Sequence, residues 1–200
     1  IFVYNPSTCN LSFRDHYIWE IKTILMRLSK QLLPLVLFLF TSTSFAQDVD
    51  FTKMFGLSKE SKEVQDVLSS GYTAKDEAGT NWFENKGAGA AIKFSTDGNV
   101  TNINLHTRLN KRKKDAGWSV YKGTFPFGLV AENVKEKSLI SSLEKQDGIT
   151  AVAKKVEAIE FTYTTTNLAG TATTINVKLV TAPTFDKGKI MVLEIQMSLA

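Results

Sequence analysis

Few side chains in this sequence have the chemistry needed for catalysis. From Gln47 to Ala200 there is one histidine, His106, and there is no cysteine. A cysteine nucleophile is therefore excluded in this stretch, and a histidine-based metal cluster has too few ligands. No Gly-x-Ser-x-Gly stretch is present, and the Gly-rich run at residues 86–91 lacks the Lys-Ser/Thr pair of a phosphate loop. The sequence predicts a protein that is not an enzyme and uses no cofactor or metal.

The carboxylates are numerous but scattered. Glu60, Glu63 and Asp66 have the spacing of one exposed helix face. Asp48 and Asp50 lie close together in the chain, but the rest of a calcium-binding loop does not follow them. These positions do not indicate a catalytic carboxylate pair, although a pair that the fold brings together would not be visible in the sequence.

The sequence predicts instead a polar surface on one face of an antiparallel sheet. In VTNINLHT, Ile103 and Leu105 alternate with polar residues, and AIEFTYTTT alternates in the same way. His106 ends its stretch on the polar side, where an exposed side chain is expected. The candidate partner-binding residues on the face that no helix covers are Lys93, Asn102, Asn104, His106, Glu160, Thr162, Thr164, Asn176, Lys178, Glu194 and Gln196.

The mixed charge of this face favours a protein partner. A small-molecule site would need a concave apolar pocket with a few polar groups. A nucleic-acid site would need a strongly basic stripe, and residues 47–200 carry 20 Lys and Arg against 18 Asp and Glu. The alternative interpretation is that any antiparallel sheet has one solvated face and that this one binds nothing.

A repeat predicts the elements that position this face. FGLSKESKEVQDVLSS at residues 55–70 resembles FGLVAENVKEKSLISS at residues 127–142, with Gly56 on Gly128 and Leu57 on Leu129. Further along the chain, residues 91–105 align with residues 176–195 if the second turn is longer. This alignment pairs Phe94 with Leu179, Asn102 with Val192, Asn104 with Glu194, Leu105 with Ile195 and His106 with Gln196. The predicted fold class is α+β, with two tandem helix-plus-three-strand antiparallel units packed as one domain.

The predicted boundaries follow from local signals. The first unit spans residues 47–110, with a helix capped by Ser58 and ended before Gly71, and with a hairpin turn at TDGN. A basic linker covers residues 111–124, where Lys111 to Lys114 are expected in a solvated loop, or in contact with an anion or a partner. The second unit spans residues 125–200, with its helix within residues 131–145.

Element order and one short motif carry a resemblance. The tandem units resemble the beta-lactamase-inhibitor-protein-like and outer-membrane-lipoprotein (SmpA/OmlA) folds of secreted bacterial proteins. YKGTFPFGL at residues 121–129 is similar to a Tyr-x-Gly-x-x-Pro-Phe-Gly-Leu segment of bacterial proteins. The resemblance implies a concave sheet face that grips a protein partner. The sequence departs from the inhibitors in having no disulfide cysteines and no recognisable inhibitory loop, so no functional residue is carried over.

The first 46 residues predict export. Arg27 and Lys30 follow the first methionine, Met26, and precede an apolar run of nine residues from Leu32. Small residues end this stretch at Ala46, as at a signal-peptide cleavage site, and nine apolar residues are too few to span a bilayer. Residues 26–46 are therefore predicted to be a signal peptide, and residues 1–25 a non-native upstream extension. The expected location is the periplasm or the exterior, with no membrane span after cleavage.

Two functional interpretations follow. The first is an exported, non-enzymatic protein-binding module, of inhibitor or immunity type, that uses the open sheet face. The second is a structural, envelope-associated periplasmic protein with no dedicated ligand.

Overall fold

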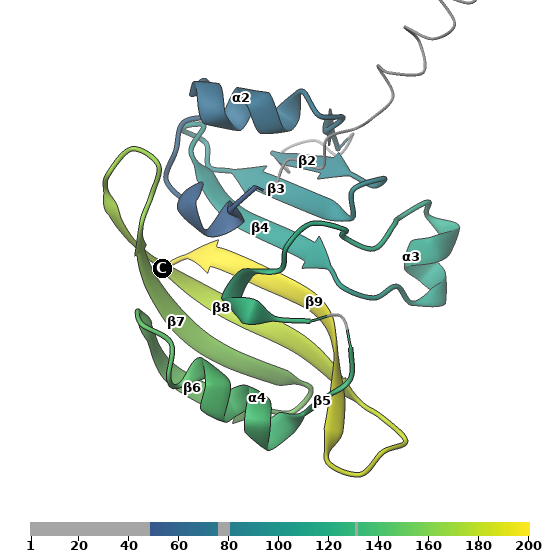
Figure 1. The fold of residues 1–200 in the computed structure, drawn as a ribbon. Coiled ribbons are helices and arrows are strands. Elements are labelled where there is room, and N and C mark those ends of the chain that lie inside the picture. Colours follow the sequence, from purple (N-terminus) through teal and green to yellow (C-terminus); the bar gives the residue numbers. More distant parts are fainter. Residues whose placement is uncertain (1–48, 76–80, 131) are drawn as a thin grey trace, which may run out of the picture. The chain divides into compact units, whose positions relative to one another are not determined.

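One antiparallel sheet dominates the molecule. The computed structural model describes residues 49–75, 81–130 and 132–200, so the predicted upstream extension, signal peptide and cleavage site at Ala46 lie outside the described residues. Within them the sheet has nine strands in the order β1-β2-β3-β4-β9-β8-β7-β6, and β5 pairs with part of β9 (Figure 1). The strands are β1 (Thr73–Ala74), β2 (Trp82–Asn85), β3 (Ala90–Phe94), β4 (Val100–His106), β5 (Val134–Lys135), β6 (Ile149–Lys155), β7 (Ala158–Thr166), β8 (Ala172–Pro183) and β9 (Lys189–Leu199).

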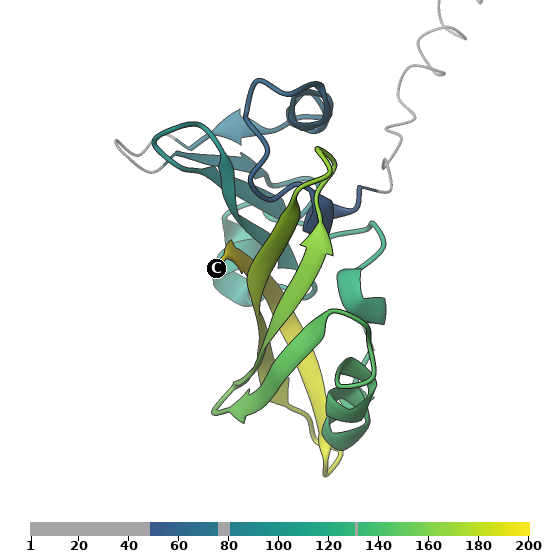
Figure 2. The ribbon, with the colours of Figure 1, turned by 90° about the vertical axis from the view of Figure 1, so that its left-hand side faces the viewer.

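The helical segments are short. They are η1 (Phe51–Lys53), α2 (Lys62–Leu68), α3 (Lys111–Asp115), η2 (Pro126–Gly128) and α4 (Glu136–Leu143). The helices α2 and α4 lie on the same side of the sheet (Figure 2). Among the described residues, no helix has both the length and the hydrophobicity that a bilayer span requires.

The alternation of side chains builds the core on the side that carries α2 and α4. Ile92, Ile103, Met197, Val177 and Phe161 are consecutive cross-strand neighbours in β3, β4, β9, β8 and β7. All five are buried, because successive residues of a strand point to opposite faces and these five share one face. The same buried cluster includes residues from the covering segments: Phe51, Met54, Phe55, Val64, Val67 and Leu143.

The loop between β7 and β8 fastens the beginning of the described chain to this core. Asn167 is buried, and its side-chain nitrogen donates to the Phe55 carbonyl at 3.1 Å. The backbone nitrogen of Leu168 donates to the Lys53 carbonyl at 3.0 Å. Polar groups of the loop therefore hold η1 and Phe55 against the sheet, and Phe55 is fully buried.

The mixed, sheet-dominated architecture confirms the predicted α+β class, but the elements differ in number and extent. Four strands, rather than three, follow each of α2 and α4. The helix α2 has Ser61 as its N-cap, whereas Ser58 lies three residues earlier in a β-bridge with Asn99. Val134, expected in the second helix, lies in β5. The predicted TDGN hairpin is confirmed, since β3 and β4 pair across it and Gly98 has φ +79°.

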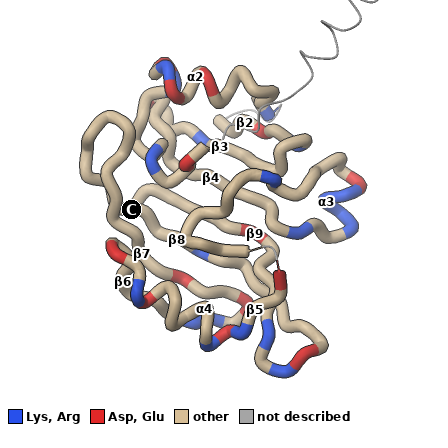
Figure 3. The backbone as a smooth tube through the Cα atoms, in the orientation of Figure 1, with Lys and Arg blue, Asp and Glu red and all other residues tan. Residues whose placement is uncertain are grey.

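The basic run also differs from its prediction as a loop. It forms α3, in which Asn110 caps the helix by accepting from the Lys113 backbone nitrogen at 2.9 Å. Lys111, Arg112 and Lys114 are exposed, and Lys and Arg are concentrated on this helix (Figure 3).

The pairing of β4 with β9 corrects one part of the predicted alignment. Leu105 lies opposite Ile195 at the centre of the sheet. Ala90 is the β3 partner of Leu105, and Leu179 is the β8 partner of Ile195. If Leu105 corresponds to Ile195, then Ala90 corresponds to Leu179, so the predicted matches Leu105 with Ile195 and Phe94 with Leu179 do not fit one superposition of the two hairpins. Bulges interrupt both hairpins, and no sequence pattern had placed them.

Candidate functional site

The uncovered face of the sheet brings most of the predicted polar residues into two rows. In the first row, Asn102, Ser198, Asn176 and Thr162 are consecutive partners in β4, β9, β8 and β7. In the second, Asn104, Gln196, Lys178 and Glu160 are partners in the same four strands. Residues from distant parts of the chain therefore meet side by side because the strand register aligns them.

These two rows line a groove with a volume of about 600 Å³. Trp82 in β2 lies at one side of the groove, and Ala151, Ala153 and Lys155 in β6 lie at the other. Ala151 has φ +54° at a bulge in β6, where two β6 residues oppose one residue of β7 and the ladder is locally broken. Both sheet halves thus contribute walls to one concave polar surface.

The side chains in the groove offer hydrogen bonds and charges of both signs. Within the described part of the chain, the amides of Asn102, Asn104 and Asn176 have no side-chain hydrogen-bond partner. Glu160 and Lys178 form an ion pair with the Lys178 Nζ 3.8 Å from Glu160 Oε1, and both are substantially exposed. Such an exposed pair contributes little to folding, so these two charges remain available to a ligand.

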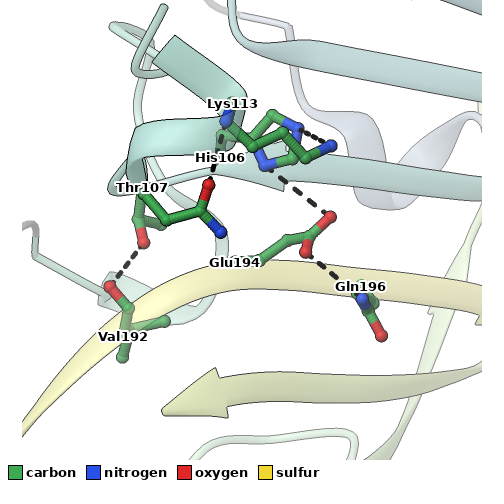
Figure 4. Close-up of polar contacts among 7 residues, drawn as sticks. His106, Thr107, Lys113, Val192, Glu194 and Gln196 are labelled. Carbon is green, nitrogen blue, oxygen red and sulfur yellow. Dashed lines mark hydrogen bonds and ion pairs between the residues drawn. The ribbon is translucent and has the colours of Figure 1, made fainter. Parts of the chain in front are cut away.

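His106 does not belong to this open surface, although it lies on the same face. Its side chain is 3% exposed, because α3 and Trp118 cover it. Lys113 Nζ lies 3.3 Å from His106 Nε2. The rings of His106 and Trp118 pack edge to face, with their centroids 4.5 Å apart. Glu194 Oε1 lies 3.7 Å from His106 Nδ1 on the other side (Figure 4). The prediction of an exposed His106 is therefore wrong.

Burial sets the protonation of this cluster. The pKa of His106 is lowered to about 4, first by desolvation and then by the Lys113 charge. The pKa of the Glu194 carboxyl is raised by desolvation, against smaller opposing effects of Lys113 and of the Gln196 hydrogen bond. A neutral imidazole that accepts from Lys113 through Nε2 and points its Nδ1 hydrogen at Glu194 fits both distances. The cluster attaches α3 to the sheet.

We expect this cluster to make stability depend on pH. The folded state keeps His106 neutral down to about pH 4, whereas the unfolded chain takes up the proton near pH 6.5. Because the unfolded state binds more protons in this window, the free energy of unfolding should fall as the pH drops through it. The His106 contribution should amount to about 2–3 kcal/mol. Glu194 acts in the opposite sense, since its raised pKa favours proton uptake by the folded state.

The measurement is urea unfolding of the wild type and of His106→Gln at a series of pH values. The wild type should lose about 2–3 kcal/mol more than the variant between about pH 7 and pH 4. Since the Gln side chain does not titrate and Glu194 is present in both proteins, the difference isolates His106. Parallel pH profiles for the two proteins would show that His106 is not the titrating group.

The remaining predicted site residues lie at the margins of the groove. Lys93 pairs with Asn102 across β3 and β4, and its Nζ lies 5.9 Å above the Trp82 ring. Thr164 lies beyond the first row, with its hydroxyl 3.3 Å from that of Thr174. Glu194 is held under α3 with His106.

The sequence analysis missed several residues of the groove, among them Ser198, Trp82 and the β6 residues Ala151, Ala153 and Lys155. Ser198 continues the polar alternation of Glu194 and Gln196 and was detectable by that signal. Trp82 was not, because its short strand carries no clear alternation and its place beside the groove depends on the pairing of β2 with β3.

The accessible groups of the groove can donate and accept hydrogen bonds and can pair with charges. In the described ranges, no three His, Cys, Asp or Glu side chains come together in a way that would hold a metal ion. The buried titratable cluster of His106 and Glu194 is covered by α3, whereas the accessible polar groups of the groove are amides, hydroxyls, the Glu160–Lys178 ion pair and the Lys155 ammonium. Comparisons with protein-family models, with curated proteins and with solved structures found no match to this chain.

Proposed function

We propose that the protein is an exported, non-catalytic binding module that holds a protein partner in the groove of its open sheet face. The observation that carries this proposal is the pair of rows across β4, β9, β8 and β7, whose polar side chains line one concavity of about 600 Å³. Unpaired amides in a concave surface favour a ligand that supplies hydrogen bonds over most of its length.

The chemistry of the groove favours a protein over the other ligand classes. Lys178 and Glu160 place both charges at its centre, which suits the mixed polar surface of a protein partner. A nucleic acid would require a continuous basic surface. The four consecutive basic residues instead form α3, where the Lys113 side chain lies over His106.

A variant of the second row tests the proposal. Asn104, Glu160, Lys178 and Gln196 are changed together to Ala, and partner capture is compared with that of the wild type. Because the binding energy of an interface is concentrated in few central residues, we expect the variant to lose at least about tenfold in affinity. A photo-reactive residue at Asn176 identifies what occupies the groove, by cross-linking in a periplasmic extract and mass spectrometry.

The control changes the same kind of residue on the covered side. Three exposed residues of α2 are changed to Ala: Lys62, Glu63 and Asp66. This change should leave partner capture unchanged. Equal capture by the row variant and the wild type would remove the groove from consideration. If no protein cross-links reproducibly at Asn176, the alternative of a structural envelope protein without a dedicated ligand is favoured.

We also propose that two tandem units of the chain form the two halves of the groove. The strand order is the same from either edge towards the centre, with β4 and β9 as the last strand of each run. Gly56 and Gly128 both have positive φ, and Leu57 and Leu129 are both buried. Against full equivalence, Phe55 is fully buried whereas Phe127 is half-buried and has φ +62°. The two Phe-Gly-Leu segments therefore share a backbone turn but not a side-chain environment.

A further inference from the structure

A second hollow lies on the covered side of the molecule, away from the groove. Its volume is about 530 Å³, and its walls come from η1, η2, the segment that follows α4, and β7. A hollow of this size is within the range of small-ligand pockets. None of its lining residues belongs to the groove described above, so the inference below is independent of the proposed function.

Aromatic rings form much of this hollow. Its aromatic lining residues are Phe51, Phe125, Phe127 and Tyr163. The rings of Phe127 and Tyr163 pack edge to face, with their centroids 5.2 Å apart. The Tyr121 ring lies behind this wall, and its centroid is 5.6 Å from that of Phe125 and 5.8 Å from that of Phe51. The wall is therefore a packed aromatic cluster with one side towards the hollow.

Phe127 is held in this wall in a strained backbone conformation. Its φ is +62°, which disfavours any residue with a Cβ atom. The side chain of Gln146 donates to the Phe127 carbonyl at 2.9 Å, and the Phe127 ring also meets Phe161 at 5.1 Å. Strain of this kind persists where surrounding contacts impose it, and it is frequent at ligand-binding positions.

The charge of the hollow has one sign. Asp50 and Asp147 are its charged lining residues, and no Lys or Arg is among the lining residues. One oxygen of Asp50 accepts from the Thr52 hydroxyl at 2.7 Å, and the other lies 3.5 Å from Lys53 Nζ. The pair of Asp50 with Lys53 is about half exposed on both sides, so it is weak and leaves the hollow with a negative potential.

Aromatic rings together with carboxylates select one class of ligand. The faces of aromatic rings attract cations, and they do so most strongly when the cation is poorly hydrated. Carboxylates repel anions, and a neutral apolar ligand would gain nothing from them. We propose that this hollow is a binding site for a small organic cation, an alkylammonium or guanidinium group carried on an apolar stem.

The test compares cations with neutral molecules of the same shape. Choline is titrated against 3,3-dimethylbutan-1-ol, and N-acetyl-arginine amide against N-acetyl-citrulline amide, with isothermal calorimetry and with amide chemical shifts of the purified protein. At least one cation should bind about tenfold more tightly than its neutral counterpart. The shifts that move should be those of Asp50, Phe127 and Gln146.

Two variants and a control locate the site. Asp50→Asn together with Asp147→Asn should weaken cation binding about tenfold, and Phe125→Leu should weaken it several-fold by removing one ring. Asp66→Asn on the exposed surface of α2 should change nothing. The inference is overturned if neither cation binds, if each cation and its neutral counterpart bind alike, or if the Asp50 and Asp147 changes leave binding as it was.

Discussion

Replacing Gly89 by alanine should destabilise the protein by about 3–5 kcal/mol. Gly89 has φ +70°, so alanine would first incur the strain of a left-handed conformation. The added Cβ would also lie 2.4 Å from the Ser119 carbonyl oxygen and 2.5 Å from the Tyr121 nitrogen. Real Cβ atoms do not approach backbone this closely, so the neighbouring segment would have to move.

That segment is not free to move. Ser119 donates to the Lys86 carbonyl and Tyr121 to the His106 carbonyl, both at 2.8 Å, while His106 donates to the Gly89 carbonyl at 2.9 Å. Displacing residues 119–121 would break these hydrogen bonds and uncover His106. We therefore expect a large drop in melting temperature, together with a shift of the His106 ring signals in the NMR spectrum.

Gly98→Ala is the matched control. Gly98 has φ +79°, and nothing lies within 4 Å of the position of its added Cβ. This variant incurs the backbone strain alone, about 1–2 kcal/mol. The difference between the two variants in urea unfolding isolates the cost of the collision at Gly89. If Gly89→Ala and Gly98→Ala prove equally stable, the packing of residues 119–121 on Gly89 is wrong.

The second large effect is expected at the junction of β4 and β9. Leu105 and Ile195 lie directly opposite one another there, and both are fully buried. Changing either one to Ala should cost about 2–5 kcal/mol, from the lost burial and the cavity that is left. Because the two side chains are neighbours in the core, their effects should not be additive in the double variant.

Unfolding of Leu105→Ala also tests whether the two strand runs form one cooperative unit. If they do, the far-ultraviolet signal and the tryptophan fluorescence should shift together to lower urea concentration. Leu199→Ala is the control, because Leu199 lies in the same strand as Ile195 but is 40% exposed. It should lower the free energy of unfolding by much less than the changes at the buried positions. Two separate transitions, of which only one moves, would mean that β1–β4 and β6–β9 unfold independently.

Alternation along single strands was sufficient to predict much of the open face. Asn102 and Asn104 in β4, and Glu160 and Thr162 in β7, lie on one side because side-chain direction has a period of two residues. This period is a local property of the backbone, so it can be read from a few consecutive residues. The same reasoning predicted the buried positions of Ile103, Leu105 and Phe161, whereas the hairpin turn at Gly98 was predicted from the turn residues TDGN.

Helix ends and short elements were predicted less well. Ser58 has the right chemistry for an N-cap, but a β-bridge with Asn99 holds it and α2 begins after Ser61. The strand β5 is two residues long and exists only through its pairing with β9. Such elements are decided by partners that lie far away in the chain, which local propensity does not include.

The sequence by itself determined which residues of each strand face the same way, that residues 47–200 hold one histidine and no cysteine, and that a sheet with one polar face would form. Only the tertiary structure decided that β4 meets β9, that α3 and Trp118 bury His106, and that Asp50 and Asp147 share a hollow with Phe127. Each of these contacts joins segments separated along the chain, and it depends on strand register and on close packing. A repeating pattern records the direction of a side chain, whereas its neighbour across the fold is set by the packing of the whole domain.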